Sequence, residues 1–310
     1  MKTVFIDGSA GTTGLRIYER LSTRKDLQLV KLPEELRKDP EARKQALNNC
    51  DVAFLCLPDA AAMESVSLIE NDHVTVLDTS TAHRPNPDWA YGFPELSAEF
   101  KEKILASKRI AVPGCHASGF ISLVAPLVQA GILDPGTRLT CHSITGYSGG
   151  GKKMIAEYED DELDPLLVAP RQYGLTQNHK HLKEMKAICG LKNAPIFCPI
   201  VANFYSGMVV TVPLFKEDLV PGKTVEDIKA VFAKQYQGPM VTYREAMDEE
   251  GFLSGAGQSE KDTMEVTVCG NEDRILLISR YDNLGKGASG AAVQCLNLVL
   301  GVEPTTGLEL

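Results

Sequence analysis

The fold is decided by a glycine-rich stretch near the start of the chain, Gly8-Ser9-Ala10-Gly11-Thr12-Thr13-Gly14. It stands between an apolar, strand-like segment at residues 3–6 and a segment with helical spacing at residues 14–22. Glycines at such a turn keep it tight and let the pyrophosphate of a dinucleotide approach the helix N-terminus. The spacing is GxxGxxG rather than the commoner GxGxxG, but its position between strand and helix favours a dinucleotide site over a glycine turn without a ligand.

Strand and helix signals alternate regularly after this turn. Strand-like segments occupy residues 27–31, 51–57 and 74–78, and segments with helical spacing occupy residues 39–48 and 60–70. Such alternation is typical of βαβ units, whose strands pair in parallel. A further strand at 109–112 follows a loop-rich stretch at residues 80–94. The pattern predicts a Rossmann-type dinucleotide-binding domain.

The second half of the chain has a different rhythm. Strand-like stretches at residues 137–145, 208–215 and 264–268 alternate with long polar segments, which favours an antiparallel α+β domain. An apolar helix expected at residues 288–300 would pack back on the first domain. The fold class is therefore α/β, with a Rossmann-type domain at residues 1–114 and 286–310 and an inserted α+β catalytic and dimerisation domain at residues 115–285.

Composition and charge exclude several classes of function. The net charge of −9 argues against partners such as nucleic acid or an anionic membrane, because either needs a basic surface. The start of the chain lacks the apolar stretch of a signal peptide, and no apolar run is long enough to cross a bilayer, so we expect a cytoplasmic protein. None of the eight cysteines forms a CxxC pair, which argues against a metal site.

The residues after the second expected strand bear on the choice of cofactor. The tip of this strand, near Lys31, offers no acidic residue for a ribose 2′-hydroxyl, whereas Arg37, Lys38 and Arg43 follow closely. Cations at this place suit a 2′-phosphate, so NADP is preferred over NAD. A solvated basic face is the alternative explanation.

Cys115 is the candidate nucleophile. It follows Pro113-Gly114 and precedes a helical segment, so we expect it on a strand-to-helix turn with the helix N-terminus beside its sulfur. Backbone N–H groups and the helix dipole would lower the pKa of this thiol and hold an oxyanion after attack. A buried structural cysteine is the alternative. Pro126 is expected to kink this helix rather than end it, because the apolar spacing continues beyond it.

Two histidines offer an acid or a base for that sulfur. His179 and His181 flank Lys180. Side chains two residues apart point to different sides of a helix or to the same side of a strand, so both need not serve one site. Surface histidines that begin a charged helix are the alternative.

Two glycine-rich segments, residues 146–153 and 282–290, could present backbone N–H groups to a cofactor or a phosphate. The first also carries Lys152 and Lys153, and the second carries Asn283 and Lys286. A flexible loop is the alternative for both.

Taken together, these segments resemble the N-acetyl-gamma-glutamyl-phosphate reductases of arginine biosynthesis, in their shorter form, over nearly the whole chain. Besides the glycine turn, the resemblance rests on motifs in the same order: Leu55-Cys-Leu-Pro-Asp59, Asp78-Thr-Ser-Thr-Ala-His-Arg84, Tyr91-Gly-Phe-Pro-Glu-Leu96, Pro113-Gly-Cys115, residues 146–153, His179-Lys-His181 with Glu184, and residues 282–290. His116-Ala117 and Leu182-Lys183 depart from the longer form and fit the shorter one.

The resemblance implies a reaction and a set of site residues. The reaction is NADP-dependent reduction of N-acetyl-gamma-glutamyl phosphate to N-acetylglutamate 5-semialdehyde through a cysteine thioester, with release of inorganic phosphate. Cys115 would be the acylated nucleophile, one of His179 and His181 the acid or base, with His179 preferred, and Glu184 would orient that histidine. NADP would contact the glycine turn, the strand end from Cys56 to Pro58, Ser148, Gly149 and Asn283. The small-molecule acyl phosphate would contact Arg84, Lys152 and Lys153.

Other functions fit parts of the pattern. Aspartate-semialdehyde dehydrogenase shares the architecture and the covalent chemistry, and the His179-Lys-His181 segment argues against it. A non-catalytic dinucleotide sensor would leave the cysteine and the histidines unexplained, and a cysteine hydrolase would leave the glycine turn unexplained. An exposed sheet in the second domain favours a homodimer or a homotetramer.

Overall fold

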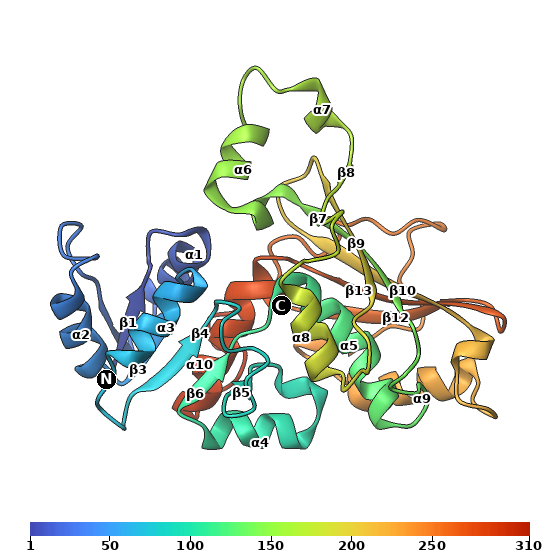
Figure 1. Ribbon diagram of the computed structural model, residues 1–310, viewed down its shortest axis with the longest axis horizontal. Coiled ribbons are helices and arrows are strands. Elements are labelled where there is room, and N and C mark those ends of the chain that lie inside the picture. The colour runs from blue at the N-terminus through green and yellow to red at the C-terminus, as the bar shows by residue number, and fades with distance from the viewer. The chain divides into compact units, whose positions relative to one another are not determined.

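The computed structural model describes all 310 residues of the chain. The chain divides into two compact units. Unit 1 comprises Met1–Pro94, Ala98–Pro113 and Ala288–Leu308, and unit 2 comprises Glu95–Ser97, Gly114–Gly287 and Glu309–Leu310. The last long helix, drawn in red in Figure 1, therefore belongs to the same unit as the first strand.

Unit 1 is built on a six-stranded sheet with the order β2-β1-β3-β4-β6-β5. All of its pairings are parallel, which confirms the expected Rossmann-type arrangement. The strands are β1 (Lys2–Asp7), β2 (Leu27–Val30), β3 (Val52–Leu55), β4 (Thr75–Asp78), β5 (Ala90–Tyr91) and β6 (Arg109–Ala111). The helices are α1 (Thr12–Ser22), α2 (Pro40–Asn48), α3 (Asp59–Ser67), α4 (Ala98–Ala106) and α10 (Gly290–Leu300).

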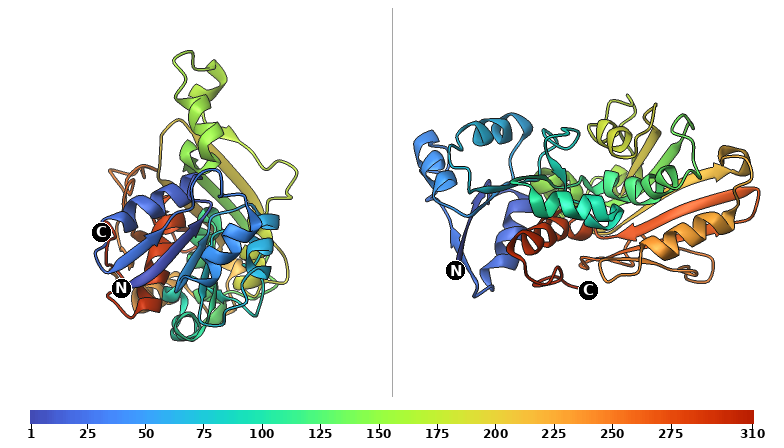
Figure 2. Two further views of the ribbon diagram at one scale, coloured as in Figure 1. Left: turned by 90° about the vertical axis from the view of Figure 1, so that its left-hand side faces the viewer. Right: turned by 90° about the horizontal axis from the view of Figure 1, so that it is seen from below.

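Alternating side chains of the central strands bury both faces of this sheet. Val4 and Phe54 pack in one core with residues of α1, α4 and α10, whereas Phe5 and Leu55 pack in a second core with residues of α2 and α3. The left view of Figure 2 shows helices on both sides of the blue strands. Burial on two faces explains why these strands read as nearly continuous apolar runs.

Local sequence sets the ends of the helices. The Asp39 carboxylate accepts the Ala42 N–H at 2.7 Å, and Pro40 occupies the first turn of α2, where a missing N–H is harmless. At the other end of the chain, α10 ends at Gly301, whose φ of +68° is the left-handed conformation that glycine adopts most easily.

Unit 2 is built on a seven-stranded sheet with the order β11-β12-β13-β10-β7-β9-β8. The strands are β7 (Thr140–Gly146), β8 (Arg171–Gln172), β9 (Ile196–Ala202), β10 (Met208–Phe215), β11 (Val241–Tyr243), β12 (Met264–Gly270) and β13 (Arg274–Tyr281). The expectation of an antiparallel sheet is wrong in part, because β7 pairs with β9 and β11 pairs with β12 in parallel. The chain returns from β7 to β9 through α6 (Gly151–Tyr158), α7 (Pro165–Val168) and α8 (His181–Ile188), a connection long enough for a parallel pairing.

Helices cover one face of the second sheet. In Figure 1, α5 (Cys115–Gln129), α8 and α9 (Val225–Gln235) lie below strands β10, β12 and β13, and α5 contacts β10, β13, α8 and α9. Every residue of α5 from His116 to Leu127 is buried, and the helix continues through Pro126 to Gln129, as its apolar spacing predicts. The start of α5 is therefore held rigidly within unit 2.

The opposite face of the second sheet is partly open to solvent. Ile144, Ile196, Phe215 and Leu276 share this face by their pairing register, and each is between 39% and 62% exposed. We call these four residues and their strands the open sheet face. Their apolar side chains are suited to contact a second protein surface.

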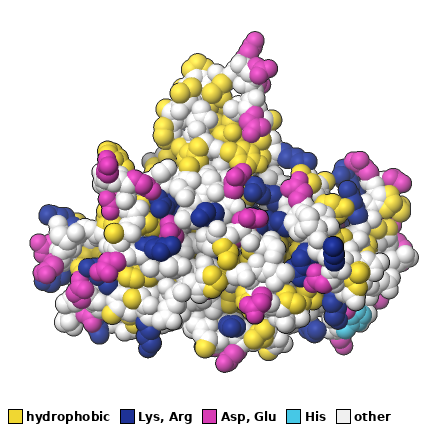
Figure 3. All heavy atoms as spheres, turned by 180° about the vertical axis from the view of Figure 1, so that it is seen from behind, with side chains coloured by type: hydrophobic (Ala, Val, Ile, Leu, Met, Phe, Trp, Pro, Cys, Tyr) yellow, Lys and Arg dark blue, Asp and Glu magenta, His cyan; other side chains and the backbone are white.

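The surface carries charges of both signs. On the side shown in Figure 3, Lys and Arg side chains are interspersed with Asp and Glu, and apolar side chains gather on the projection at the top, formed by α6 and α7. Leu166 and Val168 of α7 are 73% and 61% exposed. Every helix of the structure is too short or too polar to cross a bilayer.

Candidate active site

The glycine turn lies at the carboxyl end of β1 and leads into α1. Gly8 has a φ of +87°, and a Cβ there would lie 2.3 Å from the Cys56 carbonyl oxygen, while a Cβ on Gly14 would lie 2.4 Å from the Gly8 carbonyl oxygen. The fold therefore requires both glycines. A Cβ on Gly11 would meet no protein atom closer than 3.5 Å, so packing does not explain this residue. Its small size keeps the N-terminus of α1 open to a pyrophosphate, which fits a bound dinucleotide.

The strand order places this turn at a switch point. β1 pairs with β2 on one side and with β3 on the other, and the later strands extend from β3. In parallel sheets of this kind, ligands bind outside the carboxyl ends of the two strands at which the order reverses. Those ends are the glycine turn and the segment from Cys56 to Pro58, both of which the resemblance assigns to the cofactor. The Cys56 thiol is no nucleophile, because burial raises its pKa to about 12.

Arg43 is already engaged within unit 1, which corrects its expected role beside a 2′-phosphate. Its buried guanidinium donates to the Asp7 carboxylate from Nε at 3.2 Å and from Nη2 at 3.1 Å, and to the Ser65 hydroxyl at 2.5 Å. Asp7 is the last residue of β1 and stands directly before Gly8. The buried pair therefore braces the glycine turn from within the unit.

The other two cations after β2 are differently placed. Arg37 and Lys38 are both exposed, and Arg37 pairs with Glu34 at 3.0 Å. A surface ion pair of this kind is weak and exchanges readily with a ligand. These two residues carry the remaining case for a 2′-phosphate site.

Arg84, a predicted substrate contact, is buried in unit 1. Its Nε donates to the Val112 carbonyl at 2.9 Å and its Nη2 donates to the Thr79 carbonyl at 2.8 Å. These bonds tie the loop at residues 80–94 to the segments that follow β4 and β6. Arg84 thus braces this loop, and its contact with substrate stays a prediction.

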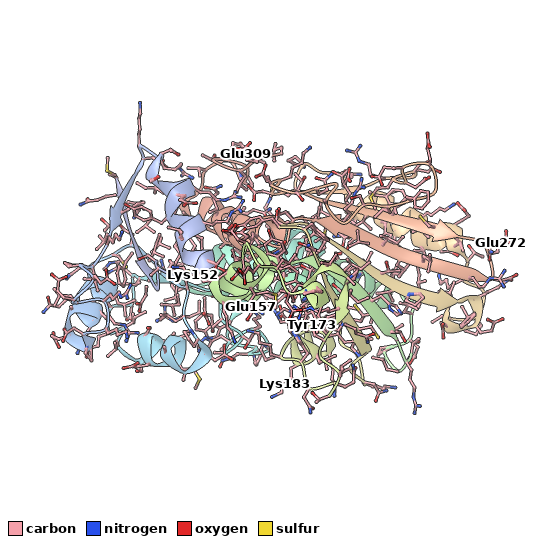
Figure 4. All side chains as sticks on the ribbon, turned by 90° about the horizontal axis from the view of Figure 1, so that it is seen from above. Lys152, Glu157, Tyr173, Lys183, Glu272 and Glu309 are labelled. Atoms are coloured by element: carbon pink, nitrogen blue, oxygen red, sulfur yellow. The ribbon has the colours of Figure 1, made fainter.

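Lys152 and Lys153, the other predicted substrate contacts, are exposed near the start of α6. Figure 4 labels Lys152 and Glu157 on this helix. Lys153 lies 3.8 Å from Glu157, a separation typical of a weak surface pair. Both lysines have room to reach an anion, and that role also stays a prediction.

Cys115 is the first residue of α5, as the sequence predicts. The Tyr281 hydroxyl donates to the Cys115 carbonyl oxygen at 2.5 Å, and a Cβ on Gly287 would lie 3.1 Å from the Cys115 Cβ. This close approach explains why the segment at residues 282–290 has a glycine there. The first turn of a helix has N–H groups without intrahelical acceptors, which suits it to hold an oxyanion formed at this sulfur.

Glu184 supports the same turn from α8. This carboxylate is buried, and its Oε1 accepts the Gly114 N–H at 2.8 Å, one residue before the nucleophile. The contact with Gly114 fixes the backbone from which Cys115 projects. The role that the resemblance gives Glu184, which is to orient a histidine, stays a prediction.

We expect Glu184→Ala to lower the free energy of unfolding by about 1–3 kcal/mol, because it leaves the buried Gly114 N–H without this acceptor. Glu184→Gln is the matched control, since its amide oxygen can still accept that hydrogen. Denaturant unfolding measures both variants. Equal stability of Glu184→Ala and the unchanged chain would contradict a supporting role.

Three histidine rings form a cluster in unit 2, where the sequence predicts two at most. The ring centroids of His179 and His181 lie 4.7 Å apart, and His116 lies 5.9 Å from the first and 5.7 Å from the second. The structure therefore brings both predicted histidines into one cluster with the residue that follows Cys115. Burial, assisted by the charge of Lys180, lowers the pKa of His179.

The protonation site of His179 follows from one hydrogen bond. The backbone N–H of His181 donates to Nδ1 of His179 at 3.2 Å. A ring nitrogen that accepts a hydrogen bond carries no hydrogen, so the neutral ring holds its hydrogen on Nε2. In this state His179 is a hydrogen-bond donor through Nε2.

Sequence reasoning missed His116 and its two hydrogen-bond partners, Ser143 and Tyr173. His116 has its Nδ1 2.6 Å from the Ser143 hydroxyl and its Nε2 2.6 Å from the Tyr173 hydroxyl. Tyr173, labelled in Figure 4, also contacts the ring of His179, with centroids 6.2 Å apart. The position of His116 beside the nucleophile was a usable signal, but nothing in the sequence marks Tyr173 or Ser143.

Four of the other cysteines are, like Cys56, poor nucleophiles in this structure. None of the eight cysteines forms a disulfide. Burial raises the pKa of Cys50 to about 12 and also raises the pKa values of Cys141, Cys189 and Cys269. A raised pKa keeps a thiol protonated and unreactive at neutral pH.

Three residues predicted to bind the cofactor lie together in unit 2. Asn283 is buried, its Oδ1 accepts the Gly207 N–H at 2.8 Å, and its Nδ2 donates to the Ser148 hydroxyl at 3.0 Å. A Cβ on Gly149 would lie 3.4 Å from that Nδ2. Asn283 therefore orders the loop after β7, and direct contact with a cofactor stays a prediction.

Lys286 is not available to an anion in this structure. It is buried and pairs with Glu95 at 2.8 Å within unit 2. The expectation that Lys286 contacts a ligand is therefore wrong in this structure. Its ion pair with Glu95 links the segment at residues 282–290 to the motif Tyr91-Gly-Phe-Pro-Glu-Leu96.

Two family models match the chain. One, described as the NAD binding domain of semialdehyde dehydrogenase, matches residues 22–104, and the other, described as the dimerisation domain of semialdehyde dehydrogenase, matches residues 115–283. The chain belongs to the semialdehyde dehydrogenase family. The second match begins at the candidate nucleophile, Cys115.

Its relatives within this class are N-acetyl-gamma-glutamyl-phosphate reductases. The chain is 44% identical to the reductases of Sinorhizobium medicae and Rhizobium meliloti over 304 residues, which cover 96% of this chain and 98% of each relative. The reductase of a Chelativorans species is 45% identical, over 96% of this chain and 97% of the relative. These comparisons confirm the resemblance stated from the motifs.

Solved structures share the fold at low sequence identity. Aspartate semialdehyde dehydrogenase II of Vibrio cholerae superposes with a TM-score of 0.72 at 16% identity, over 97% of this chain and 98% of that chain. The aspartate semialdehyde dehydrogenase of Francisella tularensis superposes with a TM-score of 0.70 at 15% identity, over 97% of this chain and 100% of that one. At this identity the likeness speaks for the fold alone.

Proposed function

We propose that the chain reduces N-acetyl-gamma-glutamyl phosphate to N-acetylglutamate 5-semialdehyde, with NADPH as reductant and inorganic phosphate as the second product. The observation that carries this function is 44% identity over 96% of the chain to reductases named for that substrate. The position of Cys115 at the start of α5 and the histidine cluster of unit 2 support it.

The residues of unit 2 supply the covalent chemistry. The Cys115 thiolate attacks the γ-carbonyl carbon, the bond from that carbon to the phosphate oxygen breaks, and a thioester remains. N–H groups in the first turn of α5 hold the carbonyl oxygen while it carries negative charge. NADPH supplies the hydride for the reduction when it is bound. The carbon–sulfur bond then breaks, which releases the aldehyde and restores the thiolate.

His179 and His181 have different roles in this proposal. His179 holds its hydrogen on Nε2, so it serves as a hydrogen-bond donor to the substrate oxygens. The task of accepting the Cys115 proton then falls to His181, whose buried ring lies 4.7 Å from His179, centroid to centroid. This assignment moves the acid or base role from His179, the residue preferred on the sequence.

One assay tests the function directly. The purified chain should reduce NADP in the presence of inorganic phosphate and N-acetylglutamate 5-semialdehyde, which is the reverse of the proposed reaction. Aspartate semialdehyde is the matched competitor, because the solved structures of the same fold are named for it. A higher kcat/KM for aspartate semialdehyde would overturn the proposed substrate.

We expect NADP to bind at least tenfold more tightly than NAD, because Arg37 and Lys38 can pair with its 2′-phosphate; a tenfold ratio corresponds to about 1.4 kcal/mol. Fluorescence titration of both cofactors measures the ratio. The double variant Arg37→Ala and Lys38→Ala should lose most of the preference, and Lys25→Ala, another exposed cation of unit 1, should keep it. Equal affinity for the two cofactors would count against the expectation.

The remaining assignments concern domains, assembly and location. We propose that residues 1–114 and 286–310 bind NADP, and that residues 115–285 carry catalysis and oligomerisation through the open sheet face. A homodimer or homotetramer is expected, and a monomer in analytical ultracentrifugation would contradict it.

Eight cysteines without a disulfide suit a reducing compartment, so we place the enzyme in the cytoplasm. A native disulfide detected by mass spectrometry would argue otherwise.

A further inference from the structure

A chain of three hydrogen-bonding side chains adjoins the nucleophile and has no part in the mechanism above. His116, the residue after Cys115, is 3% exposed and bonds to Ser143 through Nδ1 and to Tyr173 through Nε2, both at 2.6 Å. The rings of Phe197 and His179 pack around it at 5.3 and 5.9 Å between centroids. These three bonded residues, Ser143, His116 and Tyr173, are called the hydroxyl–imidazole chain below.

The His116 ring is neutral. Burial, with a smaller effect from the charge of His179, lowers its pKa to about 3. At neutral pH the ring therefore has one nitrogen that donates a hydrogen bond and one that accepts a hydrogen bond. The hydrogen bonds of the hydroxyl–imidazole chain therefore have two possible directions. They are donated either from Ser143 through His116 to Tyr173, or from Tyr173 through His116 to Ser143.

Ser143 decides between those directions. Its side chain is fully buried on β7, and the bond to His116 is the one that the structure gives its hydroxyl. If Nδ1 donated to Ser143, the serine hydrogen would be buried without an acceptor, which costs about 1–3 kcal/mol. Ser143 therefore donates to Nδ1, and His116 carries its hydrogen on Nε2 and donates to the Tyr173 oxygen.

Tyr173 is then left with its own hydrogen to donate. The residue is half-buried, so this hydrogen can meet a bound molecule where the Ser143 hydrogen cannot. Burial first, and the negative charge of Cys115 second, raise the pKa of the Tyr173 hydroxyl well above its usual value. Its bond to the ring of His116, the residue that follows Cys115, places this hydroxyl in the cluster beside the nucleophile, and the raised pKa keeps its hydrogen in place.

We propose that His116 is a positioning residue that aims the Tyr173 hydroxyl at the substrate carbonyl oxygen on Cys115, and that Tyr173 is a catalytic residue that donates a hydrogen bond to this oxygen. The hydrogen bond strengthens as the oxygen becomes negative, during attack by the thiolate and again during reduction of the thioester. The hydrogen stays on Tyr173 throughout, so no proton has to be replaced. The inference rests on the proposed function, of which it names a further part.

Activity measurements test the coupling between the two residues. Tyr173→Phe should lower kcat about 10²–10³-fold, the usual loss for one such donor, with little change in KM. His116→Phe should lower kcat at least tenfold by removing the alignment, and His116→Gln, which keeps a donor in reach of Tyr173, should recover most of that loss. In the Tyr173→Phe background, His116→Phe should have almost no further effect on kcat. His73→Phe, at an exposed histidine of unit 1, is the matched control.

A second measurement needs no activity. The ring nitrogens of a ¹⁵N-histidine-labelled chain distinguish the two neutral tautomers by NMR, and the His116 signals are identified by their loss in His116→Gln. The inference requires a neutral ring with its hydrogen on Nε2.

Two results would overturn the inference. One is a His116 ring with its hydrogen on Nδ1, because Tyr173 would then donate to the ring instead of to substrate. The other is a loss from His116→Phe that is equally large with and without Tyr173. An unchanged chain that fails to reduce NADP would refute the proposed function instead, and the NMR measurement would still decide the direction of the hydroxyl–imidazole chain.

Discussion

We expect Cys115→Ser to abolish reduction of the acyl phosphate while the fold and NADP binding remain intact. A serine hydroxyl is barely ionised at neutral pH, so it cannot replace a thiolate as the attacking group. The fold should tolerate the change, because serine is no larger than cysteine and Cys115 occupies the first position of α5. Turnover, NADP titration and denaturant unfolding measure the three properties.

Alkylation offers an independent view of the same residue. Iodoacetamide should inactivate the enzyme by labelling Cys115 first, and acyl-phosphate substrate should protect it by occupying the sulfur as a thioester. The raised pKa values of Cys50, Cys56 and Cys141 make them slow to react, so they serve as internal controls. Inactivation that follows labelling of another cysteine, or an active Cys115→Ser variant, would leave only a dinucleotide-binding fold.

The first unit could be predicted from the sequence because its signals are local. Each strand from β1 to β4 is a short apolar run, each helix from α1 to α3 has helical spacing, and glycine marks the first turn. The second sheet was harder to predict, because pairing partners depend on contacts between distant residues. β7 and β9 pair in parallel after some fifty residues of irregular chain and short helices, and no local pattern distinguishes that pairing from an antiparallel one.

In the candidate site, too, residues with local sequence signals could be predicted and residues that depend on distant partners could not. Cys115 was predictable, because a strand end, Pro113-Gly114 and a helical segment follow one another in the sequence. Arg43 was misassigned, because its partner Asp7 lies 36 residues away and becomes visible only when β1 and α2 pack together. The contact between His116 and Tyr173 spans 57 residues. Side chains that act through such distant partners leave no spacing rule in the sequence.

The histidine variants should separate the two proposed roles, with the larger effect at His181. His181→Asn removes the base and should lower turnover about 10²–10⁴-fold. It should also remove the acidic limb of the plot of kcat/KM against pH. His179→Asn keeps an oxygen where Nδ1 accepts the His181 N–H and removes only Nε2, so it should lower kcat about 10²–10³-fold. Because burial lowers the pKa of His179, its ring is already neutral at neutral pH, and its loss should leave the acidic limb in place. NADP affinity should be nearly unchanged in both variants.

Two outcomes would contradict this assignment. If His179→Asn removes the acidic limb and His181→Asn keeps it, the roles of the two histidines are reversed. If both variants keep near-normal turnover across the pH range, neither ring takes part in the chemistry.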